Sequence, residues 1–369
     1  MRNITWVTSS YMLQVDLPIL KKIKNSFNVI WFLLGSDKDK IQTARTYAEK
    51  NNINLCIRYI HHHHYSPLSC LDYIKLIKEM ALLKSNIYYF DVIAFPYLIF
   101  VIKKYLPSNK VVMAMHHGNI HDGMKLKYVY KYYLAYLCKQ PFNFQYYSNT
   151  QASYFTGNIN DRYIIPLALN DYGKVDEKPQ EGCVIFLFFG HIISTKNIGL
   201  LIEAACRLKE MSNKPFKVRI VGHCRIWGNK YQPLIKYPEL FELTIKSVPD
   251  SDIPYLFSTS HYLVLPYKSV TQSGPLRIAY GYNLPVIATD LDGFKESMVD
   301  GVTGILFKNK NVEDLVEKMK NVLDQHPTFY ISLKNAQKKY LESNLCTEVV
   351  AEKYKLMFDN IIKGYEHES

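Results

Sequence analysis

The sequence predicts an α/β protein of two domains, each built on a mostly parallel, doubly wound sheet of the Rossmann-like type. The chain has 369 residues, and at roughly 150 residues per domain this length suggests two domains. Hydrophobic residues make up 48% of the chain and charged residues 21%, which excludes a disordered chain, a coiled coil and a collagen-like fibre. Short β-branched and aromatic runs alternate with longer helical patterns in both halves, as in a doubly wound sheet.

The first half contains five runs that read as strands, with helical patterns between them. The expected strands are Ile4–Thr8, Val29–Leu34, Leu55–Tyr59, Tyr88–Ala94 and Val111–Met115, and the helices include Asp39–Asn51, Leu71–Lys84 and Lys125–Lys139. The segment Asn170–Gly182 is polar and turn-rich, which is typical of an interdomain linker. We therefore expect a first domain at residues 1–169 and a linker at residues 170–182.

The second half repeats this alternation. The expected strands are Cys183–Phe189, Phe216–Val221, Leu243–Val248, Tyr262–Leu265 and Pro285–Thr289, and the expected helices include Lys196–Lys209 and a short helix from Pro275. Further helical patterns continue to the C-terminus. We expect a second domain at residues 183–345 and a C-terminal helix at residues 346–369. One arrangement open to this helix is to pack back on the first domain.

The positive charge lies almost entirely in the first domain. The formal net charge is +12. Residues 1–168 carry 20 Lys and Arg against 9 Asp and Glu, and the remainder carries 25 against 24, so the two parts are +11 and +1. This asymmetry indicates an anionic partner for the first domain, which could be a membrane surface, a nucleic acid or a phosphorylated substrate.

Cysteine usage and apolar patterning favour a cytoplasmic protein. The seven cysteines are odd in number, widely spaced and never form a C-x-x-C motif, which favours reduced thiols over disulfides or a zinc site. The N-terminal residues lack a long apolar core and do not read as a signal peptide. The longest apolar stretches, Val29–Gly35 and Tyr97–Ile102, are too short to span a membrane. We expect that any membrane contact is peripheral, on the inner face of the cytoplasmic membrane.

The strongest chemical signal lies at residues 257–307. An apolar strand ends at Leu265, a small-residue turn follows at 271–274, and Pro275 occupies the first helical position. Proline at this position favours the start of a helix. The free N–H groups of the turn and the positive end of the helix dipole together make an anion site. A diphosphate fits such a site.

This segment resembles the C-terminal domain of family 4 glycosyltransferases. These are retaining enzymes that use nucleotide-sugar donors and have the GT-B fold, in which two Rossmann-like domains face each other across a cleft. The resemblance covers Phe186–Leu315 and includes, in the family's order, FG at Phe189-Gly190, KNIGLLIEAA from Lys196, VRIVG at Val218–Gly222, and the segment Val248–Ile253.

The resemblance implies a donor site without metal or cofactor. Lys196 would contact the donor diphosphate, and the backbone at Ser273 and Gly274 would hold the phosphates. The remaining implied donor residues are Gly190, Gly222, Val248, Thr271, Gln272 and Glu296. A lysine and a helix N-terminus can stabilise a departing nucleoside diphosphate, and the donor would be a UDP- or GDP-sugar. The alternative role for Lys196 is that of a solvated lysine at the start of a helix, and the alternative role for Glu296 is to cap a nearby helix.

The sequence departs from the family pattern at two places. Many members carry two glutamates separated by seven residues, one of which binds the donor ribose, and these positions fall near Thr271 and at Ile278 or Ala279. The sequence resembles a subgroup with a TQSG turn that lacks this pair, so Thr271 and Gln272 are candidates for the missing hydrogen bonds. The arginine that often precedes the lysine is also absent, and His191 is a nearby candidate.

In the first domain, the segment Val111–Gly123 is a strand that runs into a loop rich in histidine and glycine. It resembles a family loop in which His116 and His121 match the two histidines and His117 matches an aspartate. Ligands of α/β folds lie at the carboxyl ends of strands. His116 would contact the transferred sugar or stabilise charge near the anomeric carbon, which makes His116 and Lys196 the expected catalytic residues. The alternative is that these histidines only bond the loop backbone.

Further segments of the first domain are considered for binding. Ser9 and Ser10 stand where the family has glycines near the diphosphate, and with Asp16, His117 and His121 they form the expected acceptor site. The tract His61–His64 favours an exposed loop over a metal site, because four consecutive histidines cannot all face one ion and no carboxylate is close in sequence. Met124–Lys139 interleaves four lysines and five tyrosines with apolar residues, which suits an anionic membrane surface or, equally, a core-facing helix.

Together these features predict a retaining glycosyltransferase that moves a sugar from a nucleotide-sugar to a glycan or polyprenyl-diphosphate-linked glycan. Such acceptors occur in the assembly of bacterial capsule, O-antigen or exopolysaccharide. The alternative is a catalytically impaired GT-B scaffold that binds nucleotide-sugar or glycan, as the missing glutamates would allow. Nucleic-acid binding is suggested by charge alone, and no recognised binding motif accompanies it.

Overall fold

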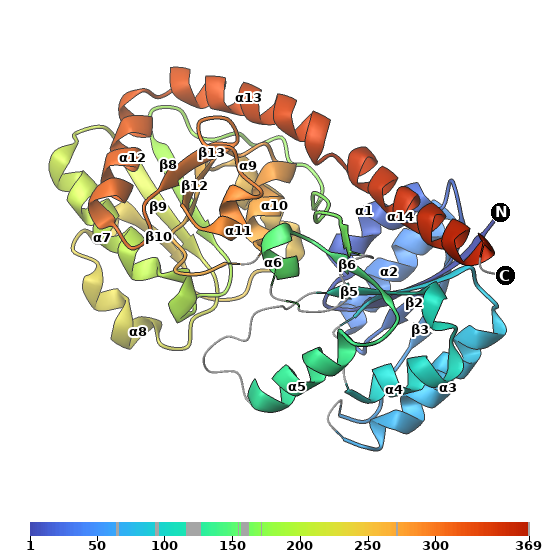
Figure 1. The fold of residues 1–369 in the computed structure, drawn as a ribbon. Coiled ribbons are helices and arrows are strands. Elements are labelled where there is room, and N and C mark those ends of the chain that lie inside the picture. The colour runs from blue at the N-terminus through green and yellow to red at the C-terminus, as the bar shows by residue number, and fades with distance from the viewer. Residues whose placement is uncertain are drawn as a thin grey trace. The chain divides into compact units, whose positions relative to one another are not determined.

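The computed structural model describes residues 1–63, 66–92, 96–115, 127–153, 155, 162–170, 172–270 and 272–367. The chain divides into two compact units (Figure 1). The first unit comprises Met1–Ala168 together with Cys346–Ser369, and the second comprises Leu169–Leu345.

The first unit is built on a seven-stranded sheet in the order β3-β2-β1-β4-β5-β6-β7, with every neighbouring pair parallel. Its strands are β1 Asn3–Ser9, β2 Asn28–Leu34, β3 Asn54–Arg58, β4 Ile87–Asp91, β5 Val111–Met115, β6 Asn143–Tyr146 and β7 Arg162–Ile164. Its helices are α1 Leu13–Ile23, α2 Lys38–Asn51, α3 Ser69–Leu82, α4 Pro96–Tyr105, α5 Lys127–Leu137, α6 Asn149–Ser153 and α14 Thr347–His367, with a 3-10 turn at Ser108–Lys110.

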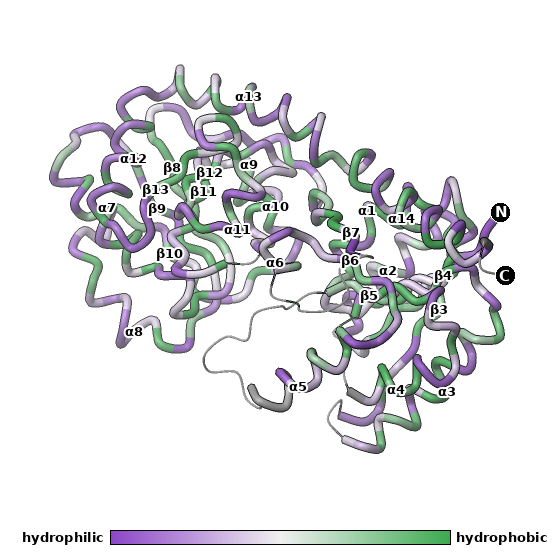
Figure 2. Tube along the Cα trace, in the orientation of Figure 1, coloured by the Kyte–Doolittle hydropathy of each residue, from purple (hydrophilic) through white to green (hydrophobic). Residues whose placement is uncertain are grey.

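Helices cover both faces of this sheet, because successive residues of a strand point to opposite sides. Trp6 and Trp31 are paired across β1 and β2 and pack into a core with α1, α2 and α14. The next residues along these strands, Val7 and Phe32, pack into a separate core with α3, α4 and α5. Strands β2, β4 and β5 are almost continuously apolar, as expected for a parallel sheet buried on both faces, and Figure 2 shows the hydrophobic strands.

The last helix of the chain completes the first unit. The Tyr354 ring lies 5.4 Å from Trp6 and 5.7 Å from Tyr89, and the Phe358 ring makes edge contacts with both. The Tyr89 and Tyr354 hydroxyls are 3.3 Å apart. Because α14 supplies these fully buried rings, the first unit is made from two ends of the chain.

The second unit is built on a six-stranded parallel sheet in the order β10-β9-β8-β11-β12-β13. Its strands are β8 Val184–Phe189, β9 Phe216–Val221, β10 Phe241–Thr244, β11 Tyr262–Leu265, β12 Val286–Thr289 and β13 Gly304–Phe307. Its helices are α7 Ile198–Met211, α8 Trp227–Lys230, α9 Ile253–Ser258, α10 Gly274–Gly281, α11 Asp292–Lys295, α12 Val312–Asp324 and α13 Thr328–Asn344, with 3-10 turns at Ser194–Lys196, Gln232–Leu234, Pro238–Leu240 and Asp250–Asp252.

The predicted doubly wound α/β class is confirmed for both units, and several predicted boundaries are wrong. β10 ends at Thr244 instead of Val248, because its partner β9 ends opposite it at Val221. α7 begins at Ile198 instead of Lys196, because Asn197 adopts a left-handed conformation with φ of 52° that breaks the helical hydrogen-bond pattern. β6, β7 and β13 were not predicted, since runs of three or four residues carry little periodicity.

None of the described helices combines the length and the apolar character that crossing a membrane requires.

Candidate active site

Two glycines bring the ends of β8 and β9 close together in the second unit. The Gly190 N–H donates to Val221 O at 3.0 Å, and the Gly222 N–H donates to Thr244 O at 3.0 Å. A Cβ built on Gly222 would overlap the carbonyl oxygen of Gly190. Gly190 itself has φ of +117°, a conformation that side chains with a Cβ rarely adopt. Both predicted donor-site glycines are therefore required by the backbone at this edge of the sheet.

Lys196 lies in the 3-10 turn that follows β8, with its ammonium held over an aromatic ring. The Nζ atom is 3.6 Å from the centroid of the buried Tyr267 ring. Tyr267 belongs to the loop after β11, and the next residue, Lys268, donates its N–H to Thr195 O at 2.8 Å. Burial lowers the pKa of Lys196 to about 8, because desolvation disfavours the charged form. The site thus holds a partly desolvated cation that would gain from an anionic ligand.

The N-terminus of α10 approaches the same strand ends. Ser273 is the N-cap, and its Oγ accepts the N–H of Leu276 at 3.3 Å. The ring of Pro275 lies 3.4 Å from the position of a Cβ built on Gly190. The positive end of α10 is therefore next to the end of β8. Thr271 lies outside the described residues, and Gln272 is partly buried.

A pair of histidines at this edge was only partly anticipated. His191 and His223 directly follow Gly190 and Gly222, and their rings stack with centroids 5.4 Å apart at 20°. The Ile192 N–H donates to His223 O at 3.0 Å, which ties the two loops together. His223 was not predicted. The signal that identifies it is the repeated Gly-His step at the ends of two adjacent parallel strands.

The structure also describes two more of the predicted donor residues, Val248 and Glu296. Val248 is half-buried against the core of the second unit, in the irregular segment after β10. Glu296 is exposed at the C-terminal end of α11, where its N–H donates to Asp292 O at 3.0 Å. In the same helix, the Phe294 ring packs 5.5 Å from the Tyr267 ring that lies beneath Lys196.

Arg277 was not anticipated from the sequence. Its side chain is buried within α10, and Nη2 donates to Ser297 Oγ at 3.2 Å. Burial lowers the pKa of this guanidinium from its ordinary value. The bond ties α10 to the residue next to Glu296.

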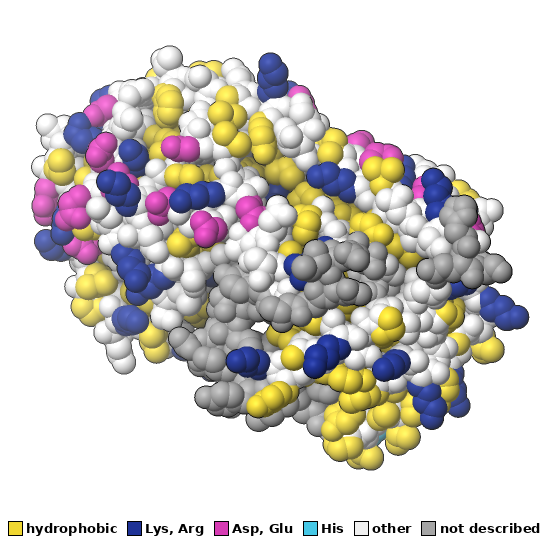
Figure 3. All heavy atoms as spheres, in the orientation of Figure 1, with side chains coloured by type: hydrophobic (Ala, Val, Ile, Leu, Met, Phe, Trp, Pro, Cys, Tyr) yellow, Lys and Arg dark blue, Asp and Glu magenta, His cyan; other side chains and the backbone are white. Residues whose placement is uncertain are grey.

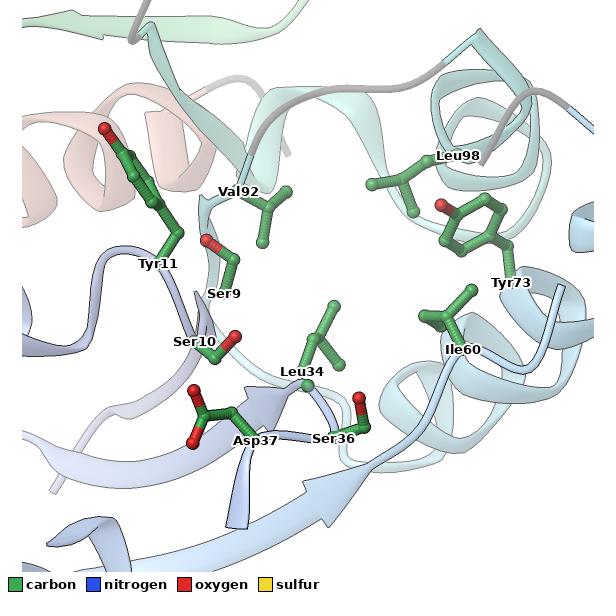
Figure 4. Close-up of a pocket in the computed structure, with 11 residues that line it drawn as sticks. Ser9, Ser10, Tyr11, Leu34, Ser36, Asp37, Ile60, Tyr73, Val92 and Leu98 are labelled. Carbon is green, nitrogen blue, oxygen red and sulfur yellow. The ribbon is translucent and has the colours of Figure 1, made fainter. Parts of the chain in front are cut away.

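Ser9 and Ser10 line a pocket in the first unit (Figure 4). The pocket has a volume of about 340 Å³ and lies where β1, β2 and β4 end. Its lining residues are Ser9, Ser10, Tyr11, Leu34, Gly35, Ser36, Asp37, Ile60, Tyr73, Val92 and Leu98. Figure 4 shows Ser9, Ser10 and Asp37 on one side of the pocket, and Ile60, Tyr73 and Leu98 on the other, with Ser36 between them. The described lining contains no lysine or arginine, and Ser9 Oγ is buried without a hydrogen-bond partner among the described residues.

The expectation that Asp16 binds an acceptor is wrong, because its side chain is buried in the first unit with 1% exposure. Oδ2 accepts hydrogen bonds from Trp6 Nε1 at 2.9 Å and from Thr8 Oγ1 at 2.5 Å. Burial and the neighbouring carboxylate of Asp91 raise the pKa of Asp16 well above its ordinary value. Asp16 is thus a structural carboxyl group within the core.

The predicted histidines of the first domain, His116, His117 and His121, lie outside the described residues. The structure describes the strand that leads to them, and the end of this strand is fixed by the Gln151 amide, which donates to Met115 O.

The histidine tract differs from the expectation in one respect. Asp72 of α3 reaches His62, with Oδ2 3.0 Å from its Nδ1, and also accepts the N–H groups of His61 and His62. A carboxylate is therefore present, although it is distant in sequence. Within the described part of the chain, no group of three or more His, Cys, Asp or Glu side chains is placed to hold a metal ion.

Residues 174–340 match the family described as Glycosyl transferases group 1. No curated protein shows significant sequence similarity to the chain. A glycosyltransferase from Rickettsia africae ESF-5 is 16% identical, with a TM-score of 0.75 over 98% of this chain and 99% of that one. Anabaena HepE in complex with UDP-glucose is 12% identical, with a TM-score of 0.72 over 98% and 100%. A sucrose-phosphate synthase from Thermosynechococcus elongatus is 10% identical, with a TM-score of 0.74 over 99% and 100%. These likenesses confirm the predicted GT-B fold.

Proposed function

We propose that this chain, whose residues 174–340 match the family described as Glycosyl transferases group 1, is a member of that family and transfers a sugar with retention of configuration from a nucleotide-sugar to a glycan acceptor. The observation that carries the proposal is the half-buried ammonium of Lys196. It lies over Tyr267 and shares its strand edge with Gly190 and the N-terminus of α10.

In the proposed reaction, the donor diphosphate binds between Lys196 and the start of α10. Charge grows on the diphosphate as its bond to the anomeric carbon breaks. A fixed ammonium and oriented backbone N–H groups stabilise that charge most effectively when they are already in place. The acceptor hydroxyl attacks the anomeric carbon from the face that the diphosphate leaves, and a phosphate oxygen takes the hydroxyl proton. His116 is proposed to contact the transferred sugar.

The nucleotide is proposed to be UDP, with GDP as the alternative. Anabaena HepE, a protein of the same fold, was solved with UDP-glucose. The remaining proposed donor contacts are Gly222, Val248, Thr271, Gln272, Ser273, Gly274 and Glu296. Ile278 and Ala279, which stand where the family has a glutamate, are buried in α10, so neighbouring groups such as Gln272 would bind the ribose.

The acceptor is proposed to enter the first unit at the pocket of Ser9 and Ser10. A lining that combines hydroxyl groups with apolar side chains such as Leu34, Ile60 and Leu98 suits a sugar ring, which has polar edges and an apolar face. We propose that this sugar belongs to a lipid-linked glycan of bacterial surface polysaccharide assembly, since the first 168 residues carry a charge of +11. Ser36→Phe would fill this pocket and should raise the KM for the acceptor without changing nucleotide affinity.

The missing glutamates favour one alternative, a scaffold that binds nucleotide-sugar without turning it over. Thermal-shift measurements with UDP, GDP, ADP, dTDP and CMP test binding. A ligand at 100 times its Kd should stabilise the protein by about 2.7 kcal/mol. Lys196→Ala should reduce the shift at the same nucleotide concentration. Lys230→Ala is the matched control. Its Nζ also lies over a tyrosine ring, 5.4 Å from the centroid of Tyr231, but Lys230 is exposed at the end of α8.

Turnover of the bound sugar then separates enzyme from scaffold. Transfer or hydrolysis that Lys196→Ala removes supports the enzyme. Binding without turnover supports the scaffold, and no shift with any nucleotide contradicts both.

A further inference from the structure

The exposed face of α3 carries a stripe of leucines and lysines. Tyr73, Leu76, Ile77 and Met80 are buried against the sheet. Leu71, Lys75, Lys78 and Leu82 are exposed on the opposite side, at spacings of three and four residues that place them on one face of the helix. Leu71 is 62% exposed and Leu82 is 81% exposed. Large apolar side chains at this exposure, in line with lysines, form an exposed amphipathic face among the described residues.

The neighbouring helix α4 continues this face. It packs against α3 and exposes Phe100, Lys103 and Lys104, with Phe100 at 52% exposure. The two stripes meet at Tyr105, where Lys78 Nζ of α3 and Lys104 Nζ of α4 lie 5.3 and 5.5 Å from the same ring centroid. Figure 3 shows hydrophobic side chains gathered over this part of the molecule, with Lys and Arg side chains beside them.

The acidic residues of these two helices do not neutralise the stripe. α3 contains Asp72 and Glu79, and α4 contains no acidic residue. Asp72 bonds His62 and the backbone of the histidine tract. Glu79 pairs with Arg58 of β3, with Oε2 2.8 Å from Nε. Four exposed lysines on α3 and α4 therefore face solvent together with three exposed apolar side chains.

We propose that the α3–α4 face, defined by Leu71, Lys75, Lys78, Leu82, Phe100, Lys103 and Lys104, docks on an anionic phospholipid surface. Leucine and phenylalanine side chains enter the boundary between headgroups and acyl chains, while lysines snorkel to the lipid phosphates. Charge complementarity selects a membrane over an uncharged partner. The role of this surface, which is to bring the first unit to a membrane-held acceptor, rests on the proposed function.

Sedimentation with vesicles tests the surface directly. The probes are vesicles of phosphatidylglycerol mixed with phosphatidylcholine, and vesicles of phosphatidylcholine alone. The whole protein should bind the anionic vesicles at low salt and bind less at physiological salt. Lys78→Gln with Lys104→Gln should lower the partition coefficient about 30-fold, because each lysine near an anionic surface contributes about fivefold. Leu82→Ser with Phe100→Ser should lower it at least about tenfold at both salt concentrations, because loss of each apolar side chain removes favourable burial and apolar insertion is not screened by salt.

The matched control is Lys21→Gln with Lys50→Gln, which removes the same charge from exposed positions on α1 and α2. These helices cover the opposite face of the sheet. A control that loses as much binding as the α3–α4 variant would overturn the proposed face, as would a wild-type protein that ignores anionic vesicles at low salt. A wild-type dimer that Leu82→Ser with Phe100→Ser converts to monomer would instead assign the face to a second copy of the chain.

A thermal shift with UDP separates the failure of this proposal from the failure of the proposed function. Retained nucleotide binding without vesicle binding rejects the α3–α4 face alone. Vesicle binding without any nucleotide shift supports the face and rejects the donor site.

Discussion

The affinity of the donor site for a nucleoside diphosphate should fall as pH rises from 7 to 9. Burial lowers the pKa of Lys196 to about 8, so the free protein holds this ammonium about nine-tenths protonated at pH 7 and about one-tenth at pH 9. A bound diphosphate favours the charged form and raises the pKa. Binding at pH 9 must therefore first protonate the amine, which weakens the affinity about tenfold relative to pH 7.

Isothermal titration with UDP across this range measures the effect. The phosphate groups have lost their last proton by pH 7, since their second pKa is about 6. Lys196→Met should weaken UDP binding at pH 7 by about 10- to 150-fold, the value of a charge-assisted hydrogen bond. It should also abolish the pH dependence, whereas Lys230→Ala should retain it. A pH slope that survives in Lys196→Met would refute the reasoning.

Three further predictions concern stability and use thermal or denaturant unfolding. Gly222→Ala should lower the free energy of unfolding by about 1–3 kcal/mol or more. Gly228→Ala is the control and should leave the free energy of unfolding almost unchanged, because a Cβ at Gly228 meets nothing within 4 Å. Equal effects of the two substitutions would contradict the close approach of the strand ends. The Nδ1 atom of His261 accepts the N–H of Ile185 in β8 at 3.0 Å, and the pKa of His261 is lowered to about 4, first by burial and then by neighbouring charges. Between pH 6.5 and pH 4 the unfolded chain protonates this imidazole more readily than the folded chain, so the free energy of unfolding should fall by up to about 3 kcal/mol over this range. His261→Asn should remove this pH dependence. Burial beside Asp91 raises the pKa of Asp16, so the folded state binds the extra proton and stability falls as pH rises above about 4. Asp16→Asn should gain stability relative to the wild type at pH 8 but not at pH 4, and a constant difference would contradict the shared burial of the two carboxyls.

The parts of the fold that sequence reasoning predicted are those with a local signal. Apolar strand runs and helical periodicity gave both sheets, and the Ser-Gly-Pro step located the start of α10 to within one residue. The errors follow from non-local causes. β10 ends where its partner strand ends, and the left-handed Asn197 delays α7. Neither cause can be read from the segment itself.

The candidate site shows the same division between local and non-local signals. Gly190 and Gly222 were named as donor residues from the family resemblance, and the close approach of their backbones appears only in the folded chain. Asp16 was predicted to belong to the acceptor site, and only the folded chain places Trp6 and Thr8 around it. The stacking of His191 on His223 depends on the pairing of β8 with β9, which a pattern within one segment does not specify.

The origin of the first unit from two separate stretches of chain has a consequence for its biosynthesis. The rings of Tyr354 and Phe358 that cover Trp6 and Tyr89 follow a second unit of 177 residues, Leu169–Leu345. At ribosomal speeds, that unit takes about 10 to 35 s to emerge. During this interval the second unit can fold, while the part of the first sheet that α14 later covers, around Trp6 and Tyr89, is still exposed beside α1 and α2. The nascent first unit is therefore the stage of synthesis at which this protein most needs protection from aggregation.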